Sequence, residues 1–141
     1  MTESDTTTAD ALAQLSFAVM AALEKCSDRH GLSVAQARML GILRDREPLM
    51  TALGAAMGLD KSSISGLVDR AERRGLVERY RSTQDGRAVH VRLTDEGRER
   101  IRRGEAEFAA EIARLVAPLA PGARAELTRH AISVAAAASA I

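Results

Sequence analysis

The sequence predicts a mainly α-helical chain with one small β-hairpin. Two observations carry this prediction. Apolar residues recur at intervals of three and four, the spacing of one helix face, over long stretches of the 141 residues. Residues 89–93 (VHVRL) instead alternate between apolar and polar side chains, which is the period of a strand with one buried face. The strand pattern lies between two helical parts of the chain.

Composition limits what this chain can bury on its own. Charged residues make up 28% and hydrophobic residues 46%, but aromatic residues make up only 2%, and alanine supplies much of the apolar count. Alanine buries little area, and burial stabilises by roughly 25 cal/mol per Å² of apolar surface. A chain of 141 residues suits one structural subunit, and we expect pairing with a second copy to supply further burial.

The chain carries no pattern of export or membrane insertion. Its first ten residues are polar and acidic, and no apolar run approaches the ~20 residues of a spanning helix. Cys26 is the single cysteine, so an internal disulfide is impossible, which agrees with a reducing compartment. We expect a soluble, cytoplasmic, nucleoid-associated protein without a membrane partner.

The first 31 residues are predicted to hold a tail and one helix. Residues 1–8 lack apolar periodicity and are expected to fray. A seam of apolar residues follows at helical spacing, and Gly31 ends that helix. The seam consists of Leu12, Leu15, Val19, Ala22 and Cys26. The helix therefore has one face that must be buried.

Capping residues mark where the remaining helices are expected to begin. Ser33 and Gln36 match a capping box, in which the Ser33 hydroxyl accepts from the Gln36 amide and the Gln36 side chain returns the bond. Thr51, Asp60 and Thr94 are placed to begin three more helices. Acidic residues follow Thr94 directly, where the helix dipole favours negative charge.

Helix breakers mark the expected ends. Pro48 follows the second helix, Gly58 breaks a short third helix, and Gly75 occupies the left-handed position after a fourth. The long helix after these elements is expected to end near Pro118. The last segment, residues 121–141, is alanine-rich, and its apolar surface is too continuous to remain in water. We interpret it as an interface.

Residues 76–81 are the expected partner of the strand at 89–93. Asp85 and Gly86 lie in the connection between the two strands. This dipeptide favours the positive-φ turns whose twist matches a β-hairpin. A hairpin is therefore predicted directly after the fourth helix.

The order of these elements is that of a winged helix-turn-helix. We assign residues 32–94 to this DNA-binding lobe and residues 1–31 and 95–141 to N- and C-terminal dimerisation helices. Between residues 61 and 92 there are eight basic and four acidic residues, a net +4, which leaves −3 for the rest of a chain of net charge +1. A cationic middle is typical of an element that faces phosphates, although a solvated charged surface has the same composition.

Contacts to DNA are expected along the fourth helix. Its first turns carry short or flexible side chains that allow close approach to base edges and phosphates, namely Lys61, Ser62, Ser63, Ser65 and Gly66. Arg70, Arg73 and Arg74 follow as candidate phosphate contacts. The serines are also ordinary residues of a helix start, and Arg73 and Arg74 also suit a helix C-terminus without DNA.

Two stretches resemble the multiple-antibiotic-resistance regulator (MarR) family. They are GLVDRAERRGLVERY at residues 66–80 and DGRAVHVRLTDEG at residues 85–97. The family's words L-V-D-R-L-E-x-x-G-L-V-x-R, D-x-R and L-T-x-x-G occur in this order and at this separation. The flanking helices match only by length and pattern. Ala71 stands where the family usually has leucine, which leaves less volume under the helix.

The resemblance implies a bacterial DNA-binding regulator. In that family the terminal helices of two chains interlace and place two recognition helices in successive major grooves of a pseudo-palindromic operator. Arg87 would be the wing-tip arginine that enters the minor groove, an environment that attracts arginine, and Asp85 would brace the wing. Repression is the commoner mode, and small aromatic or phenolic effectors are common. We therefore expect a ligand-responsive, homodimeric repressor.

The sensing chemistry stays open on the sequence alone. One subgroup of the family senses peroxide with a cysteine in a Q-L-C-F-A context, whereas this chain reads QLSFA, with Ser16 in place of the thiol. A hydroxyl cannot perform that chemistry. Cys26 lies on the apolar seam, and a thiol-responsive regulator that uses it is an alternative to a merely buried residue. Phe17, Met20 and Met39 suit a ligand crevice, although residues at this helical spacing more often belong to a core.

Other classes of function find little support in the sequence. We expect neither an enzyme nor a cofactor, because no nucleophile with a base and no phosphate-binding loop is visible. His30, His90 and His130 are far apart and lack ligand spacing, which argues against a metal site. The rival interpretation is a winged-helix adaptor that binds protein, which would not require the helix serines or Arg87.

Overall fold

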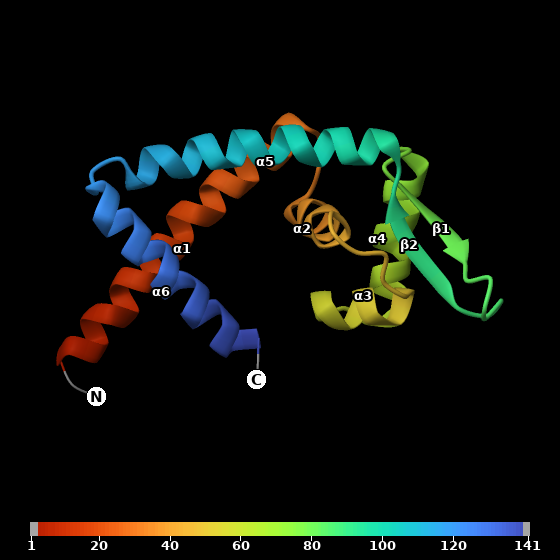
Figure 1. Ribbon diagram of the computed structural model, residues 1–141, viewed down its shortest axis with the longest axis horizontal. Coiled ribbons are helices and arrows are strands. Elements are labelled where there is room, and N and C mark those ends of the chain that lie inside the picture. The colour runs from red at the N-terminus through yellow and green to blue at the C-terminus, as the bar shows by residue number, and fades with distance from the viewer. Residues whose placement is uncertain (1–2, 140–141) are drawn as a thin grey trace. The chain divides into compact units, whose positions relative to one another are not determined.

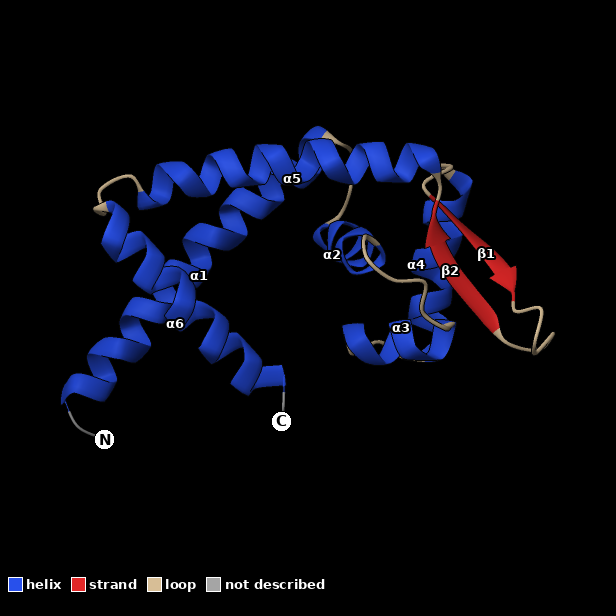
Figure 2. Cartoon of the chain, viewed as in Figure 1, coloured by secondary structure: helices blue, strands red, loops and turns tan. Residues whose placement is uncertain are grey.

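The computed structural model describes residues 3–139 (Figures 1 and 2). Within that range the chain forms α1 Glu3–Arg29, α2 Val34–Leu43, α3 Met50–Met57, α4 Lys61–Arg73, β1 Val77–Arg81, β2 Val89–Leu93, α5 Asp95–Val116 and α6 Pro121–Ser139. The predicted fold class, mainly helical with one hairpin, is confirmed. Contacts divide the chain into two compact units, Met1–Phe108 and Ala109–Ile141, and each is described by itself. The domain limits expected at residues 31 and 94 stay a prediction.

Helix α1 is longer than the sequence pattern indicated. It begins at Glu3, inside the stretch that was expected to fray, because a helix that is already nucleated extends through polar residues without an apolar seam. Residues 1–2 lie outside the described range. The helix ends at Arg29, and Gly31 follows with φ +63°. This left-handed glycine is the predicted stop signal.

Three predicted N-caps are present in the structure. The Ser33 hydroxyl accepts from the Gln36 amide at 3.1 Å, and the Gln36 side chain accepts from the Ser33 amide at 3.2 Å. The Thr94 hydroxyl accepts from the Gly97 amide at 3.0 Å. Asp60 caps α4 in the same way. These caps depend on residues within three positions of each other, which is why the sequence reveals them.

The start of α3 differs from the prediction. Thr51 was expected to cap this helix, but α3 begins one residue earlier, with Leu49 at the N-cap and no side-chain cap bond. Leu49 is placed by a β-bridge to His90, and the neighbouring Pro48 carbonyl accepts from the Val91 amide at 3.0 Å. Pairing with β2 therefore positions the helix start in place of a capping side chain.

The two strands form an antiparallel pair from Val77 opposite Leu93 to Arg81 opposite Val89. The predicted hairpin is confirmed, but the expected turn is wrong. Among the described residues, positive φ angles occur at three other glycines and not at Gly86. The strands are joined by a seven-residue loop, 82–88, which is too long for a two-residue positive-φ turn.

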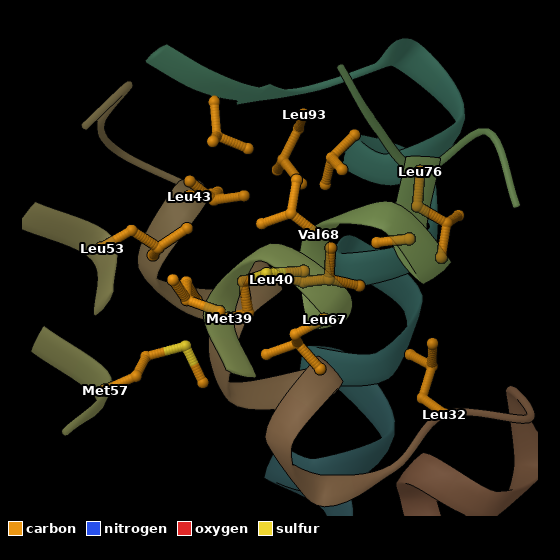
Figure 3. Close-up of a cluster of buried hydrophobic side chains, with 14 residues drawn as sticks. Leu32, Met39, Leu40, Leu43, Leu53, Met57, Leu67, Val68, Leu76 and Leu93 are labelled. Atoms are coloured by element: carbon orange, nitrogen blue, oxygen red, sulfur yellow. The ribbon is translucent and has the colours of Figure 1, made fainter. Parts of the chain in front are cut away.

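The hydrophobic core lies among α2, α3, α4 and the hairpin (Figure 3). Its buried side chains are mostly aliphatic, and none is aromatic. They are Leu32, Met39, Leu40, Leu43, Leu53, Met57, Ile64, Leu67, Val68, Ala71, Leu76, Val77, Val91 and Leu93. Each large aliphatic side chain stabilises by about 1.5–3 kcal/mol when fully buried. Because all of these residues lie between positions 32 and 93, the predicted lobe has a core of its own.

A close backbone contact joins the start of α5 to the start of the hairpin. The Thr94 amide donates to the Leu76 carbonyl at 3.1 Å, and the Thr94 hydroxyl donates to the Gly75 carbonyl at 2.5 Å. A Cβ at Gly97 would lie 2.0 Å from the same Leu76 oxygen, which is too close for a carbon and an oxygen that are not bonded to each other. The glycine of the L-T-x-x-G word is therefore required by packing.

The C-terminal unit exposes its apolar side chains. No residue of α6 is buried, and Ile132 and Val134 are 64% and 59% exposed. Between the two helices, the Arg124 guanidinium donates to the Leu119 carbonyl at 2.8 Å. Nowhere in residues 3–139 is a helix both long and apolar enough to cross a membrane.

Candidate nucleic-acid interface

Helix α4 has one buried and one exposed side. The buried side consists of Ile64, Leu67, Val68 and Ala71. Lys61, Ser62 and Ser63 are exposed in the first turn, while Ser65 and Gly66 are half-buried. The predicted contact residues at the helix start therefore lie on or beside the exposed side. Short side chains there leave room for the edge of a base or a phosphate to approach the backbone.

Asp60 fixes the N-terminus of α4. Its carboxylate accepts from the Ser63 amide at 2.7 Å and from the Ser62 hydroxyl at 3.1 Å. These bonds hold the pKa of Asp60 below its ordinary value, and the bond from the Ser63 amide has the largest effect. The cap is therefore charged at neutral pH. The Ser62 oxygen is thereby held in one place while its lone pairs can accept a further bond.

Arg70 and Arg73 are exposed along the second half of α4. The Arg70 guanidinium lies close to Gly66, 3.3 Å from where a Cβ at that glycine would be. Among the described residues, no ion pair neutralises either arginine. Both charges are therefore available to an anionic partner, as a phosphate contact requires.

Arg74 has a different environment. It caps the C-terminus of α4, and its guanidinium donates to the Gly31 carbonyl at 2.6 Å and to the His30 carbonyl at 2.9 Å. These carbonyls close the C-terminal end of α1. The structure thus does not bring Arg74 together with the other candidate contacts, because its donors are engaged by backbone 43 and 44 residues away in the sequence.

Arg79 of β1 was not singled out by sequence reasoning, although it holds α4 to the hairpin. Its guanidinium pairs with Asp69 at 2.8 Å and with Glu72, both on α4. It also approaches the Ser65 carbonyl at 3.4 Å. The side chain is only 24% exposed, so these bonds form with limited competition from water. The signal available in the sequence was the pair of acidic residues four positions and one position before the end of α4, which indicates no partner.

The loop between the strands is braced by Asp85, as the resemblance implied. The Asp85 carboxylate accepts from the Arg87 amide at 3.0 Å, and the Asp85 carbonyl accepts from the Ala88 amide at 3.0 Å. The Arg81 guanidinium donates to the Gly86 carbonyl at 2.8 Å. An aspartate that bonds its own backbone two residues on forms a turn without positive φ. The side chain of Arg87 is left exposed at the tip.

A groove of about 690 Å³ separates α4 from this loop. The groove is lined from one side by Lys61 and Ser65 and from the other by Asp85 and Arg87. In Figure 2 the strands lie beside α4, and the loop that joins them extends past its end. Candidate contacts from two separate segments of the sequence therefore border one concave surface, whose lining is mostly apolar and whose charged residues are mainly basic.

The outer face of the hairpin is a stack of aromatic and basic side chains. The Tyr80 and His90 rings stack with centroids 5.1 Å apart, and Arg92 lies 4.4 Å above the Tyr80 ring. The Tyr80 hydroxyl donates to the Glu47 carboxylate at 2.8 Å, which raises the pKa of Tyr80. The His90 Nδ1 lies 2.8 Å from the Glu47 carbonyl. This cluster attaches the hairpin to the segment before α3.

The three residues that were predicted to suit a ligand crevice do not line a common cavity. Met39 is completely buried in the core of the lobe (Figure 3), whereas Phe17 and Met20 on α1 are 73% and 42% exposed. A cavity of about 150 Å³ instead lies between α1, α2 and α5, where Leu23, Cys26 and Arg100 contribute to its lining. Cys26 is itself only 4% exposed, which disfavours a freely reactive thiol.

Metal ligands do not gather in the described part of the chain. Over residues 3–139 no group of three or more His, Cys, Asp or Glu side chains could hold an ion. His30 has a single carboxylate beside it, with its Nε2 3.2 Å from Glu107. This histidine is hydrogen-bonded, as His90 is.

The fold and the groove define a winged helix-turn-helix protein of the class that reads duplex DNA. A sequence model of the MarR family matches residues 30–88. The chain is also 28% identical over 102 residues to the HTH-type transcriptional regulator YkoM of Bacillus subtilis (strain 168), an alignment that covers 72% of this chain and 66% of that protein. The chain thus spans just under two thirds of that relative's length.

Solved structures agree with this assignment. A MarR-family transcriptional regulator from Rhodococcus sp. RHA1 is 27% identical, with a TM-score of 0.78 over 96% of both chains. CouR from Rhodococcus jostii RHA1, solved with bound p-coumaroyl-CoA, is 28% identical, with a TM-score of 0.73 over 89% of both chains. Residues 30–88 thus carry the winged helix-turn-helix of the MarR family of transcriptional regulators, and solved MarR-family structures match the fold of nearly the whole chain.

Proposed function

We propose that this chain is a ligand-responsive repressor that binds a pseudo-palindromic DNA operator as a homodimer. The observation that carries the proposal is the groove, because it brings Lys61 and Ser65 of α4 to face Asp85 and Arg87 of the wing. In this arrangement α4 enters a major groove, and Arg87 enters the adjoining minor groove. The phosphate backbone between the two DNA grooves occupies the protein groove.

The homodimer is supported by apolar surface that the single chain leaves uncovered. The first half of α1 exposes Leu12 and Leu15 by 52% and 42%, and α6 buries none of its residues. Surfaces of this kind on a small protein mark an interface. A second copy of the chain is the partner that a two-fold operator requires, because half-site spacing mirrors the symmetry of the dimer.

A small aromatic or phenolic effector is supported by the cavity between α1, α2 and α5. The cavity is lined by apolar side chains such as Leu23 and Phe108, and Arg100 also contributes a polar group to the lining. Its volume of about 150 Å³ suits a ring rather than a drug-sized ligand. CouR, which was solved with p-coumaroyl-CoA, shares this fold.

A salt titration of Arg87→Ala tests the proposed DNA contacts. The probe is the duplex that wild-type protein selects from a random-sequence library, and binding is measured by fluorescence anisotropy. We expect Arg87→Ala to weaken binding by about tenfold and to lower the slope of log K against log salt by about 0.9 for each lost contact.

Arg103→Ala is the matched control, because Arg103 is an exposed arginine on α5 that pairs with Glu99 at 3.5 Å. It should bind DNA like the wild type. An unchanged dissociation constant for Arg87→Ala would remove Arg87 from the interface. Failure of the wild type to select any duplex at low salt would contradict DNA binding itself and favour the protein-binding adaptor.

A further inference from the structure

Arg74 holds two helices together at their C-terminal ends. Its two terminal nitrogens donate to the carbonyls of Gly31 and His30 at 2.6 and 2.9 Å. A Cβ at Gly31 would lie 3.4 Å from the Nη2 of Arg74, an ordinary contact distance, and glycine is favoured at this position by its φ of +63°. A planar, two-pronged donor suits two adjacent carbonyls, which an ammonium group cannot match.

A second arginine reaches the same place from α5. The Arg100 guanidinium donates to the His30 carbonyl at 3.2 Å, and its side chain is 22% exposed. The last carbonyls of a helix lack partners within the helix and carry partial negative charge. Two guanidinium groups therefore converge on the end of α1, one from α4 and one from α5.

The recognition helix is thus fixed at two separate points. Arg79 binds its C-terminal half to the hairpin through Asp69 and Glu72, whereas Arg74 binds its last turn to the end of α1. The buried side of α4 already packs into the core, and the Arg74 contact adds a constraint at the end of the helix that the core packing does not provide. The angle at which α4 enters a DNA groove depends on the direction of the helix.

We propose that Arg74 is a positioning residue that sets the direction of the recognition helix through the end of α1 and contacts no phosphate. The proposal rests on the DNA-binding function argued above. It separates two adjacent arginines by role: both are exposed and neither has a carboxylate partner among the described residues, but Arg74 donates to two backbone carbonyls. Arg73 serves as the phosphate contact, and Arg74 aims the helix.

The test compares Arg74→Ala, Arg74→Lys and Arg73→Ala in salt titrations on the duplex selected by the wild type. Loss of one phosphate contact lowers the salt slope by about 0.9, or about 1.8 for a dimer. Of the three variants, we expect only Arg73→Ala to show this reduction in salt slope. Arg74→Ala should bind about tenfold more weakly, the scale of one lost charge-assisted hydrogen bond, with the wild-type slope. Arg74→Lys should resemble Arg74→Ala, because it retains the charge but not the two-pronged donor.

Two results would overturn the proposal. One is a reduced salt slope for Arg74→Ala that matches the slope of Arg73→Ala. The other is full wild-type affinity of Arg74→Lys, since lysine can replace arginine at a phosphate but not at paired carbonyls.

Amide hydrogen exchange of the free protein gives a second readout that needs no DNA. We expect faster exchange in the last turn of α1 and the last turn of α4 for both Arg74 variants, and wild-type rates for Arg73→Ala. If wild-type protein selects no duplex, the proposed function fails, and the exchange rates alone decide whether Arg74 joins the two helices. If Arg74→Ala fails to fold, Arg74→Lys still decides the question. Wild-type exchange rates in this variant would contradict the proposal that Arg74 joins α1 and α4.

Discussion

The lobe over residues 32–93 and the C-terminal helix α6 use similar side chains in opposite ways. In the lobe, Leu53, Val68 and Val91 are completely buried, and a contiguous cluster surrounds them. In α6, Ile132 and Val134 are more than half exposed, and no residue is buried. The comparison teaches that the lobe buries its own apolar side chains, whereas α6 leaves its apolar side chains exposed.

The boundary between these two behaviours runs through the single helix α1. Leu12 and Leu15 are exposed, while Ala22 and Cys26 are 9% and 4% exposed. The apolar seam predicted from the sequence continues over both halves without a break. A periodic pattern identifies the face that must be covered, but it carries no information on whether the same chain covers it.

Removal of α6 is the strongest way to break the comparison. We expect a chain truncated after residue 121 to form monomers or aggregates and to lose operator binding, because the proposed dimer interface is gone. The lobe should remain folded, since its core cluster contains no residue beyond Leu93. Light scattering measures the assembly state, and circular dichroism reports on the lobe. A truncated chain that stays dimeric and binds DNA would show that α6 is not the interface.

Gly97→Ala tests the closure of the lobe from the inside. An alanine in an ordinary helix position stabilises by up to about 1 kcal/mol relative to glycine, but here its Cβ would meet the Leu76 carbonyl at 2.0 Å. We expect a loss of about 3 kcal/mol in the free energy of unfolding, measured by urea denaturation. Gly104→Ala is the matched control on α5, because the nearest atom to its Cβ is His30 Cδ2 at 4.0 Å. Similar stabilities for the two variants would disprove the packing argument.

Asp60→Ala gives the smallest expected effect and sharpens the account of α4. The folded state lowers the pKa of Asp60 below its ordinary value of 3.8 through bonds from Ser63 and Ser62. A lowered pKa stabilises the fold above the unfolded-state value, and this contribution is lost as the pH falls through the folded-state value. We therefore expect Asp60→Ala to unfold at a lower temperature than wild type near pH 7, with the difference shrinking below about pH 4. A gap that persists undiminished into acid would mean that the charge of the cap contributes nothing.

Local signals account for the part of the fold that the sequence predicts well. Each helix cap involves residues at most three positions apart, so a short stretch of sequence is enough to recognise it. The caps are Ser33, Asp60 and Thr94. The start of α3 departs from prediction because Leu49 is placed by pairing with His90, a contact between residues far apart in the chain. The loop at Gly86 departs because Asp85 forms the turn with its side chain.

The candidate site divides in the same way. Exposure of Lys61 and Ser62 follows from the periodicity of α4, which the sequence reveals. The partners of Arg74 and Arg79 do not follow from it, because a run of arginines looks alike whether its members face solvent, a carboxylate or the end of another helix. Met39 is buried in the core, the role that its helical spacing favoured over a ligand crevice.

The contact at Gly97 also makes this position a marker for comparing sequences. A related chain that keeps the threonine cap but has a larger residue four positions after the end of β2 cannot seat its long helix against the Leu76 carbonyl as this one does. Such a chain must lift that helix away from the strand or bend the strand beneath it. A glycine at this position therefore predicts whether a relative packs α5 against the start of the hairpin in the same way.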